Sequence, residues 1–394
     1  MKSAFFHDVY VAQDGNQFFS SGSLHKGVVS RYVKHFGDLT LVCREDSKSD
    51  VKSLSLIGGT DDNLSFRPVP NLASFNLLNI FRAVKVFRNV RSENDLLIVR
   101  LPSVVGFIAA SVFTYVYGDK KNVLIELVGC PYETYRHLGT LKGKLLAKPL
   151  ARLTRALVKK AENVSYVTNV SLQASYPSQG VNVIGCSDAD IKVDDQVFNR
   201  RLSTLEKKSE DQLTIGMIGF LNAKYKGFDL AFKALKEVRE ATKKNVVLEI
   251  VGAGNPEKLK SIAQNEGIEN HVNFVGTKSF PGGVFEWLDN IDIYIQPSRS
   301  EGMPRSLMEA MSRACCCVGS RVGDIDQLLD EKYVHDVDDH RTLSKILVSL
   351  TKIENRIANI KSCFNSIQYH DASVLEAKRS AFFNRVTYGL MQKS

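Results

Sequence analysis

Short apolar runs alternate with amphipathic stretches along most of this 394-residue chain. In the first half, helical periodicity extends over 24–35 and 102–117. The apolar runs there predict strands near 4–10, 39–43, 95–99, 123–128 and 164–168. Strands that alternate with helices in this way are typical of α/β domains with parallel sheets.

The alternation stops over a polar, charged segment at 191–211 and then begins again. The second half predicts strands at 213–218, 246–251, 272–274, 291–295 and 315–319, and helices at 228–242, 256–266 and 304–313. Because the chain is too long for one ordinary core, we expect two doubly wound domains with a ligand-binding cleft between them. The predicted parts are a first domain at 1–190, a linker at 191–211, a second domain at 212–370 and a C-terminal helix at 371–394, which is helical over 372–391 and whose docking place the pattern leaves open.

Composition places the chain among folded globular proteins, with 44% hydrophobic and 24% charged residues. No run approaches the roughly 18 apolar residues of a bilayer-spanning helix. His7 and Asp8 interrupt the apolar N-terminus at once, so no standard secretory signal is expected and the cytoplasm is the default compartment. The formal net charge of +9 suggests anionic partners such as nucleotide-sugars, phospholipids or nucleic acids, although no nucleic-acid-binding module accompanies it.

Three of the seven cysteines are consecutive, at Cys315, Cys316 and Cys317. Neighbouring residues of a strand point to opposite faces, so this run cannot gather three thiolates around one metal. No CxxC spacing occurs in the sequence. We therefore interpret the three cysteines as small buried side chains of a strand.

The window from Gln296 to Met311 carries the clearest chemistry. A strand ends near Ile295 and a helix is predicted to begin at Pro304, since proline suits the first helical position. The free N–H groups of Arg305 and Ser306, together with the helix dipole, would then form an anion site suited to a diphosphate.

Two carboxylates flank this predicted helix start, Glu301 in the preceding loop and Glu309 inside the helix. Carboxylates accept hydrogen bonds from hydroxyls, so Glu301 would hold a transferred sugar and Glu309 a ribose. Arg305 in the first turn opposes the helix dipole at a cost of roughly 0.3–1 kcal/mol, which a bound diphosphate would offset. An exposed arginine whose cost the fold tolerates is the alternative.

The spacing from Glu301 to Glu309 within EGMPRSLMEAM resembles the retaining glycosyltransferases of family four, which have the GT-B fold of two facing Rossmann-like domains. Gly219 to Gly227 resembles that family's loop bringing a lysine to the donor diphosphate, and Gly252-Ala-Gly254 its next turn. The resemblance implies an acceptor-side first domain and a second domain that binds the nucleotide-sugar. It implies a donor site of Gly22, Lys224, Lys226, Glu301, Gly302, Met303, Pro304, Arg305, Ser306 and Glu309.

The first half matches this family more loosely. Gly22 would let the backbone approach the donor phosphates, although an ordinary helix-entry turn explains it as well. The stretch from Glu126 to His137 resembles a bacterial subgroup active in surface-polysaccharide assembly. Two departures stand out: Phe220 replaces an arginine that many members have, and Val128-Gly-Cys130 replaces a histidine near the reacting sugar. His137 could approach the site, but a structural role is the better interpretation.

The resemblance implies that the acceptor attacks from the face that the nucleoside diphosphate leaves, so the anomeric configuration is retained. Lys226 and Arg305 would stabilise the leaving diphosphate and Glu301 would position the sugar, which makes these three the predicted catalytic residues. No Asp-x-Asp motif of the metal-dependent transferases is seen. We therefore expect no metal and no cofactor, with the nucleotide-sugar as co-substrate.

A basic amphipathic helix is predicted over 142–160, where seven basic residues and no acidic one are interleaved with leucines. Such a helix can lie on an anionic inner leaflet, which would place the enzyme at the membrane periphery near a lipid-linked acceptor. Alternatively, the leucines face the core and the lysines are only solvated.

Three other functions compete with sugar transfer. A nicotinamide dehydrogenase is rejected, because Gly252-Ala-Gly254 lacks the third glycine of the dinucleotide fingerprint. A nucleotide-sugar epimerase, phosphorylase or hydrolase on the same fold stays open. So does a catalytically silent sugar- or nucleotide-binding scaffold, because of the two departures. The donor nucleotide, sugar, acceptor, linkage and oligomeric state do not follow from the sequence.

Overall fold

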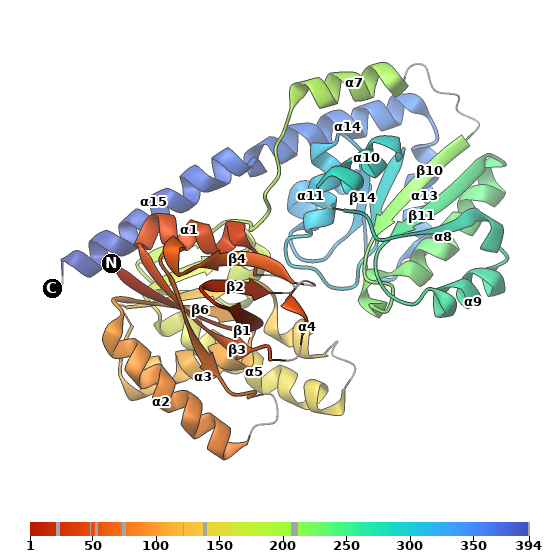
Figure 1. The fold of residues 1–394 in the computed structure, drawn as a ribbon. Helices are drawn as coiled ribbons and strands as arrows, with labels where there is room; N and C mark the ends of the chain where they lie inside the picture. Colours follow the sequence, from red (N-terminus) through yellow and green to blue (C-terminus); the bar gives the residue numbers. More distant parts are fainter. Residues whose placement is uncertain are drawn as a thin grey trace. The chain divides into compact units, whose positions relative to one another are not determined.

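The computed structural model describes residues 1–20, 24–47, 49–51, 54–72, 76–120, 122–136, 140–205, 212–279 and 281–392 (Figure 1). The chain forms two compact units. Unit 1 comprises Met1–Cys186 together with Ala377–Ser394, and unit 2 comprises Ser187–Glu376. Among the helices that the structure describes, none is both long and apolar enough to cross a bilayer.

Unit 1 is built on a mainly parallel sheet, in which β5, β3, β1, β6, β7, β8 and β9 follow one another and β2 and β4 add an antiparallel extension beside β1. The described strands are β1 (Lys2–Asp14), β2 (Gln17–Ser20), β3 (Asp38–Glu45), β4 (Ser55–Gly59), β5 (Leu64–Val69), β6 (Leu96–Leu101), β7 (Val123–Leu127), β8 (Asn163–Tyr166) and β9 (Asn182–Gly185). The short strands β2 and β4 were not predicted, since each offers too few residues for a visible alternation.

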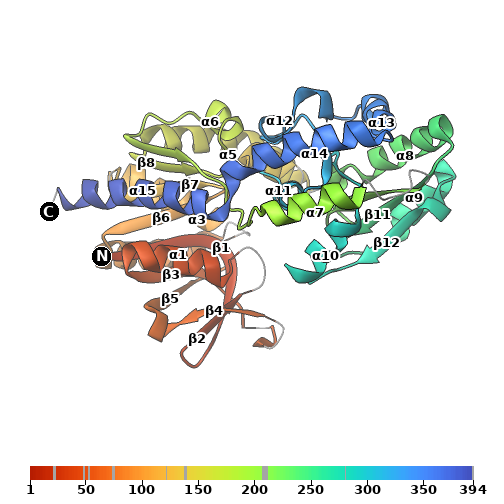
Figure 2. The ribbon, with the colours of Figure 1, turned by 90° about the horizontal axis from the view of Figure 1, so that it is seen from above.

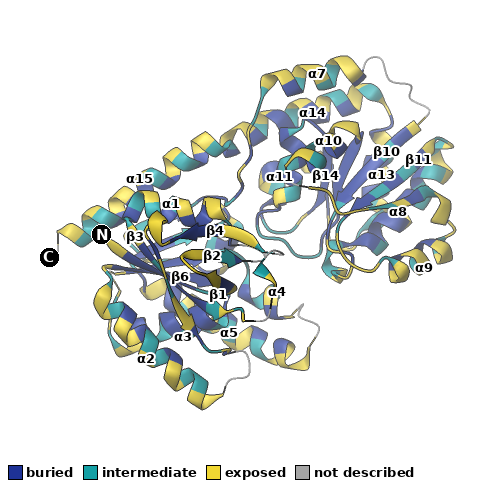
Figure 3. Cartoon of the chain, in the orientation of Figure 1, coloured by how far each residue is buried: buried dark blue, intermediate teal, exposed yellow. Residues whose placement is uncertain are grey.

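Helices cover both faces of this sheet (Figures 1 and 2). They are α1 (Lys26–Phe36), α2 (Leu77–Glu93), α3 (Val104–Ser111), α4 (Pro131–Arg136), α5 (Leu141–Lys160) and α6 (Ser171–Ser175). Helices α2, α3 and α5 share one core with the central strands, built on side chains such as Phe87, Phe107 and Leu157. Burial is concentrated in the strands and in the helix faces that meet them (Figure 3).

The final helix α15 (Ala372–Met391) matches the predicted range. From Ala377 onward it belongs to unit 1, which gives the docking place that the sequence pattern leaves open. Phe383 of α15 packs on Tyr32, His35 and Phe36 of α1, with ring centroids 4.8–6.1 Å apart. Burial of this aromatic cluster explains why the chain returns to unit 1.

Unit 2 contains an all-parallel sheet with the strand order β12-β11-β10-β13-β14-β15. Its described elements are α7 (Asp195–Leu205), β10 (Gln212–Ile218), α8 (Phe228–Thr242), β11 (Asn245–Val251), α9 (Glu257–Glu266), β12 (Val272–Gly276), α10 (Gly282–Asn290), β13 (Ile293–Gln296), α11 (Arg305–Ser312), β14 (Cys316–Ser320), α12 (Ile325–Leu328), β15 (Val334–His335), α13 (His340–Ser349) and α14 (Ile353–Ile367). In chain order this is the 3-2-1-4-5-6 arrangement of a Rossmann-type sheet. Cys315, Cys316 and Cys317 are fully buried, as interpreted from the sequence.

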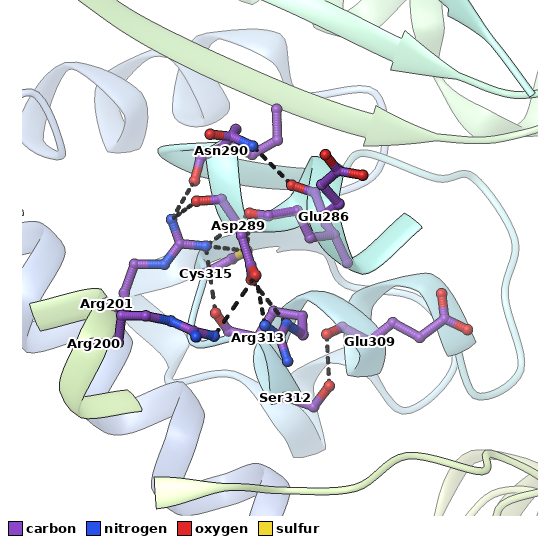
Figure 4. A network of polar contacts seen from close by, with 11 residues as sticks. Arg200, Arg201, Glu286, Asp289, Asn290, Glu309, Ser312, Arg313 and Cys315 are labelled. Atoms are coloured by element: carbon purple, nitrogen blue, oxygen red, sulfur yellow. Dashed lines mark hydrogen bonds and ion pairs between the residues drawn. The ribbon is translucent and has the colours of Figure 1, made fainter. Parts of the chain in front are cut away.

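The segment 191–211 differs from the predicted linker, because its residues Asp195–Leu205 form α7 and belong to unit 2. Arg201 of α7 donates hydrogen bonds to the carbonyls of Leu288, Asp289 and Ile291, at and beyond the last turn of α10 (Figure 4). A guanidinium there satisfies carbonyls that have no partner within the helix. The polar composition that suggested a linker is thus that of a surface helix; residues 206–211 lie outside the described residues.

Candidate functional site

The best-defined candidate site lies in unit 2, at the carboxyl ends of β10 and β13. These strands are neighbours in the sheet, but the chain continues from β10 to one side and from β13 to the other. At such a switch point the two following loops diverge and leave room for a ligand. The loop after β10 carries Lys226, and the loop after β13 carries Glu301.

The structure joins these two residues directly. Lys226 Nζ donates to Glu301 Oε1 at 2.8 Å, and both side chains are largely enclosed, with 15% and 12% of their surfaces exposed. The pair is therefore held by the fold more firmly than a surface ion pair would be. It brings together two of the predicted catalytic residues that lie 75 positions apart in the sequence.

A buried polar network orients the Glu301 carboxylate. Its Oε1 also accepts hydrogen bonds from Gln296 Nε2 at 2.8 Å and from Ser298 Oγ at 2.7 Å. Gln296 in turn accepts from Tyr294 OH and from Ser306 Oγ on α11. Gln296 and Ser298 are fully buried. Because every donor around it is fixed, the carboxylate has one well-defined position.

Arg299 ties the two loops together. Its backbone N–H donates to the Tyr225 carbonyl at 2.6 Å, and its guanidinium donates to the Lys224 carbonyl at 2.9 Å. The same guanidinium makes a two-point contact with Asp229 at the start of α8. Bidentate arginine–carboxylate contacts fix geometry as well as supplying energy. Arg299 therefore sets the position from which Lys226 reaches Glu301.

The predicted anion site at the start of α11 is present with a shift of one residue. Pro304 is the N-cap, with ψ 101°, and the helix begins at Arg305, so the prediction of Pro304 as first helical residue is corrected. The Pro304 carbonyl accepts the first helical bond, from Met308. Arg305 and Ser306 have no backbone acceptor among the described residues. These N–H groups are available to an anion.

Glu309 lies one turn into α11, and Figure 4 shows its side chain extending away from the Arg201–Asp289–Arg313 network. Its carboxylate makes no hydrogen bond with any described residue. Burial raises the pKa of Glu309, and the charge of Arg305 partly opposes this shift. An enclosed carboxylate without donors is suited to accept hydrogen bonds from ligand hydroxyls.

We predict that Glu309→Gln raises the melting temperature of the unliganded protein while weakening nucleotide binding about tenfold. A carboxyl whose pKa is raised in the folded state destabilises that state once the pH exceeds its unfolded pKa. The stability gain should therefore grow as the pH rises above the ordinary carboxyl range and vanish below it. Calorimetry across pH measures this, with the exposed Glu286→Gln on α10 as the matched control. Equal behaviour of the two variants would contradict the assignment.

The remaining predicted site residues divide into three groups. Gly302 and Met303 lie in the loop before α11, where the Gly302 carbonyl accepts from Asp324 N–H and Met303 is buried. The Lys224 side chain is exposed, and no contact joins it to Glu301. Gly22 and His137 lie outside the described residues, so their assigned roles stay predictions.

Several residues of the site were not predicted individually: Tyr294, Gln296, Ser298, Arg299 and Ser320. The sequence held one indication of them, because polar residues follow directly upon a fully buried strand at Gln296. Ser320 donates to the Ser298 carbonyl from the neighbouring strand β14. Only the sheet order brings that contact about, which no local pattern reveals.

In unit 1, the stretch that resembled a bacterial subgroup begins with a buried ion pair. Glu126 of β7 accepts from Arg100 of β6 at 3.1 Å, and both side chains are less than one-tenth exposed. Cys130, at the place of the expected histidine, lies 3.3 Å from the Tyr176 hydroxyl. The described part of this stretch thus contributes internal contacts of unit 1.

Residues 201–361, which contain this site, match the model of the family described as "Glycosyl transferases group 1". The chain carries a glycosyltransferase group 1 domain. The match includes α11, both glutamates and the Lys226 loop, so the site lies wholly within the glycosyltransferase group 1 domain.

The similarity extends beyond this domain. Protein CapJ of Staphylococcus aureus is 29% identical over 384 residues, which cover 96% of this chain and 90% of CapJ. The structure of Anabaena HepE in complex with UDP and glucose superposes with a TM-score of 0.65 at 13% identity, covering 98% of this chain and 99% of HepE. Sucrose-phosphate synthase from Thermosynechococcus elongatus gives a TM-score of 0.67 at 12% identity, with 98% and 99% coverage. These structures confirm the predicted GT-B fold with two Rossmann-like domains.

Proposed function

We propose that the protein is a retaining glycosyltransferase that transfers a sugar from a nucleotide-sugar to a glycan during assembly of a bacterial surface polysaccharide. The observation that carries the proposal is the enclosed Lys226–Glu301 pair beside the open N–H groups of α11. The glycosyltransferase group 1 domain supports the reaction class. The similarity to CapJ along nearly the whole chain supports a role in capsule or related polysaccharide synthesis.

The donor diphosphate would bind at the start of α11, against the N–H groups and Arg305. Lys226 would then turn from Glu301 toward the diphosphate, and Glu301 would accept hydrogen bonds from the sugar hydroxyls. The acceptor hydroxyl attacks the anomeric carbon from the face of the leaving diphosphate. As the bond between the anomeric carbon and the diphosphate oxygen breaks, negative charge grows on the diphosphate, where Lys226 and Arg305 would stabilise it. The proton of the acceptor hydroxyl would pass to the leaving diphosphate. Glu309 would hold the ribose.

Radiolabel transfer tests this function. We expect label to move from a nucleotide-sugar to a glycan acceptor with retained configuration. Release of free sugar would indicate a hydrolase, and isomerisation of the donor would indicate an epimerase. Binding without turnover would indicate a catalytically silent scaffold.

The donor nucleotide can be identified by thermal shift with UDP-, GDP- and ADP-sugars. A ligand present at one hundred times its dissociation constant stabilises the folded protein by about 2.7 kcal/mol. The UDP complexes of HepE make UDP-sugars the first choice.

We predict that turnover does not require a divalent cation. The charge that a cation would supply to the leaving diphosphate is assigned here to Lys226, Arg305 and the helix N–H groups. Turnover should therefore be unchanged by excess EDTA. Loss of activity on chelation, with recovery on adding manganese or magnesium, would contradict this prediction.

The acceptor is proposed to be lipid-linked, with the enzyme on the cytoplasmic side of the membrane. Helix α5 supports this through its unbalanced charge, since Lys142, Lys144, Lys148 and Arg152 are all exposed. The alternative for α5, leucines that face the core, holds for its second half, where Leu157 is fully buried and Leu150 and Leu153 pack against the core. In its first half, Leu141 and Leu145 are 75% and 68% exposed.

A further inference from the structure

Helices α2 and α5 of unit 1 both begin with large apolar side chains that face solvent. In α2 these are Leu77, Leu78 and Phe81, with 76%, 70% and 79% of their surfaces exposed. In α5 they are Leu141 and Leu145, with 75% and 68% exposed. We call these five residues the apolar tips. Large apolar side chains that gather on a protein surface commonly mark a site at which a partner or a membrane binds.

Exposed basic residues lie beside the tips and beyond them along each helix. We call the exposed residues Arg82, Lys85, Arg88, Lys142, Lys144, Lys148 and Arg152 the basic collar. None of them forms an ion pair within the part of the chain that the structure describes. The spacing is similar in the two helices, since Phe81, Lys85 and Arg88 recur at helical steps as do Leu145, Lys148 and Arg152.

The two helix starts lie at the same edge of the unit 1 sheet. Helix α2 leads from β5 into the parallel strand β6, and α4 and α5 lead from β7 into β8. Both helices therefore begin at the carboxyl edge of the sheet and run back along it. Helix α3 contacts α2 and α5, so the three form one layer, with the outer faces of α2 and α5 exposed (Figures 1 and 3).

This order of apolar tip and basic collar fits one occupant, a bilayer that carries anionic lipids. A helix rises about 1.5 Å per residue, so Lys85 and Arg88 lie about 6–10 Å beyond Phe81 along the axis, and Lys148 and Arg152 about 4–10 Å beyond Leu145. Arg82, Lys142 and Lys144 lie at the level of the tips, and their long side chains can reach toward the headgroups from there. That distance matches the depth between the acyl boundary and the headgroup phosphates. The first-turn N–H groups of Leu78 and Gly143 are already bonded to the side chains of Asn76 and Thr140, which lowers the cost of leaving water.

We infer that unit 1 docks on an anionic membrane tip-first, with the apolar tips inserted among the headgroups and the basic collar on the lipid phosphates. The carboxyl edge of its sheet then faces the bilayer, which is where a lipid-linked acceptor would enter. The statement about the acceptor rests on the proposed function, whereas the docking itself does not. A helix that bound the membrane surface through its basic residues alone would leave the apolar tips exposed to water.

Vesicle sedimentation tests the insertion. The tip variant combines Leu78→Ser, Phe81→Ser and Leu145→Ser, and its control combines Val181→Ser with Tyr369→Ser, which are 84% and 77% exposed elsewhere. On phosphatidylcholine vesicles containing about one-third phosphatidylglycerol, the tip variant should bind at least about tenfold more weakly, and the control should bind like wild type. Equal binding of tip variant and wild type overturns the inference, as does a tip variant that instead loses self-association in size-exclusion chromatography.

The collar is tested with Lys85→Gln, Lys148→Gln and Arg152→Gln. This variant should lose binding at low salt and lose preference for anionic vesicles. A collar variant that loses binding while the tip variant keeps it would point to charge alone, or to an anionic glycan, and would overturn insertion.

A depth measurement completes the test. Phe81→Trp should be quenched by brominated acyl chains, while Trp287 in unit 2 is only 6% exposed and supplies the unquenched reference. Activity on a water-soluble acceptor separates the two proposals. Transfer without vesicle binding removes the docking inference alone, and vesicle binding without any transfer removes the proposed function alone.

Discussion

Replacing the Glu301 carboxylate by an amide, in Glu301→Gln, should lower turnover by a factor on the order of 10²–10³. The amide keeps the size of the side chain, but its –NH₂ group cannot accept hydrogen bonds from the sugar. The amide also removes the negative partner of Lys226, which lies 2.8 Å away and is 15% exposed. Lys226 would then be free to bind the diphosphate before the sugar is in place. We expect kcat to fall with little change in nucleotide affinity, measured by label transfer and by calorimetric titration.

The control is an ion pair of the same length that has no part in the site. Glu257 and Lys260 on α9 lie 2.9 Å apart with both side chains more than half exposed. Glu257→Gln should leave turnover unchanged and alter stability by less than about 1 kcal/mol. If Glu301→Gln behaves like this control, the role assigned to Glu301 is wrong. If only melting temperature falls, the pair is structural.

The alternation of apolar and amphipathic segments predicted most elements that form the sheets. Helix Phe228–Thr242 and the final helix Ala372–Met391 have the predicted ends, and the buried cysteine strand is shifted by one residue. Local patterns suffice there because each element buries one continuous face. They did not reveal that Arg201 binds the end of α10, since that contact joins residues far apart in the chain.

Of the site, the sequence predicted those residues whose spacing within one segment indicates their role. Glu301, Arg305 and Glu309 occupy one strand–loop–helix segment, so their spacing alone indicated an anion site with flanking carboxylates. The contact of Lys226 with Glu301 was not predicted, because it depends on β10 and β13 being neighbours. Gln296 and Ser298 were also not recognised, although they hold the carboxylate from within that segment. A polar side chain whose role is to donate a hydrogen bond to another side chain produces no periodic pattern in the sequence.

Replacing Gly227, which directly follows Lys226, by alanine should destabilise the folded protein strongly. Gly227 has φ +76°, and a Cβ added there would lie 2.0 Å from the Pro297 carbonyl oxygen. Gly227→Ala therefore carries both the cost of a positive φ, about 1–2 kcal/mol, and a clash with backbone that only a shift of the loop relieves. We expect a loss of about 3 kcal/mol or more, equivalent to a fall of about 6–12 °C in the melting temperature of a unit of this size.

The same substitution at Gly267, at the end of α9, distinguishes the cost of the positive φ from the cost of the clash. Its φ is +71°, close to that of Gly227, but no atom lies within 4 Å of an added Cβ. Gly267→Ala should therefore show only the positive-φ cost, about 1 kcal/mol after the gain from a less flexible unfolded chain. The difference between the variants measures the close approach of the 224–227 loop to Pro297. Because Arg299 joins the same loops, that approach positions Lys226 against Glu301. Gly227→Ala should thus also lose nucleotide binding, whereas Gly267→Ala keeps it, and equal stability of the two variants would show that the loops are not held together as described.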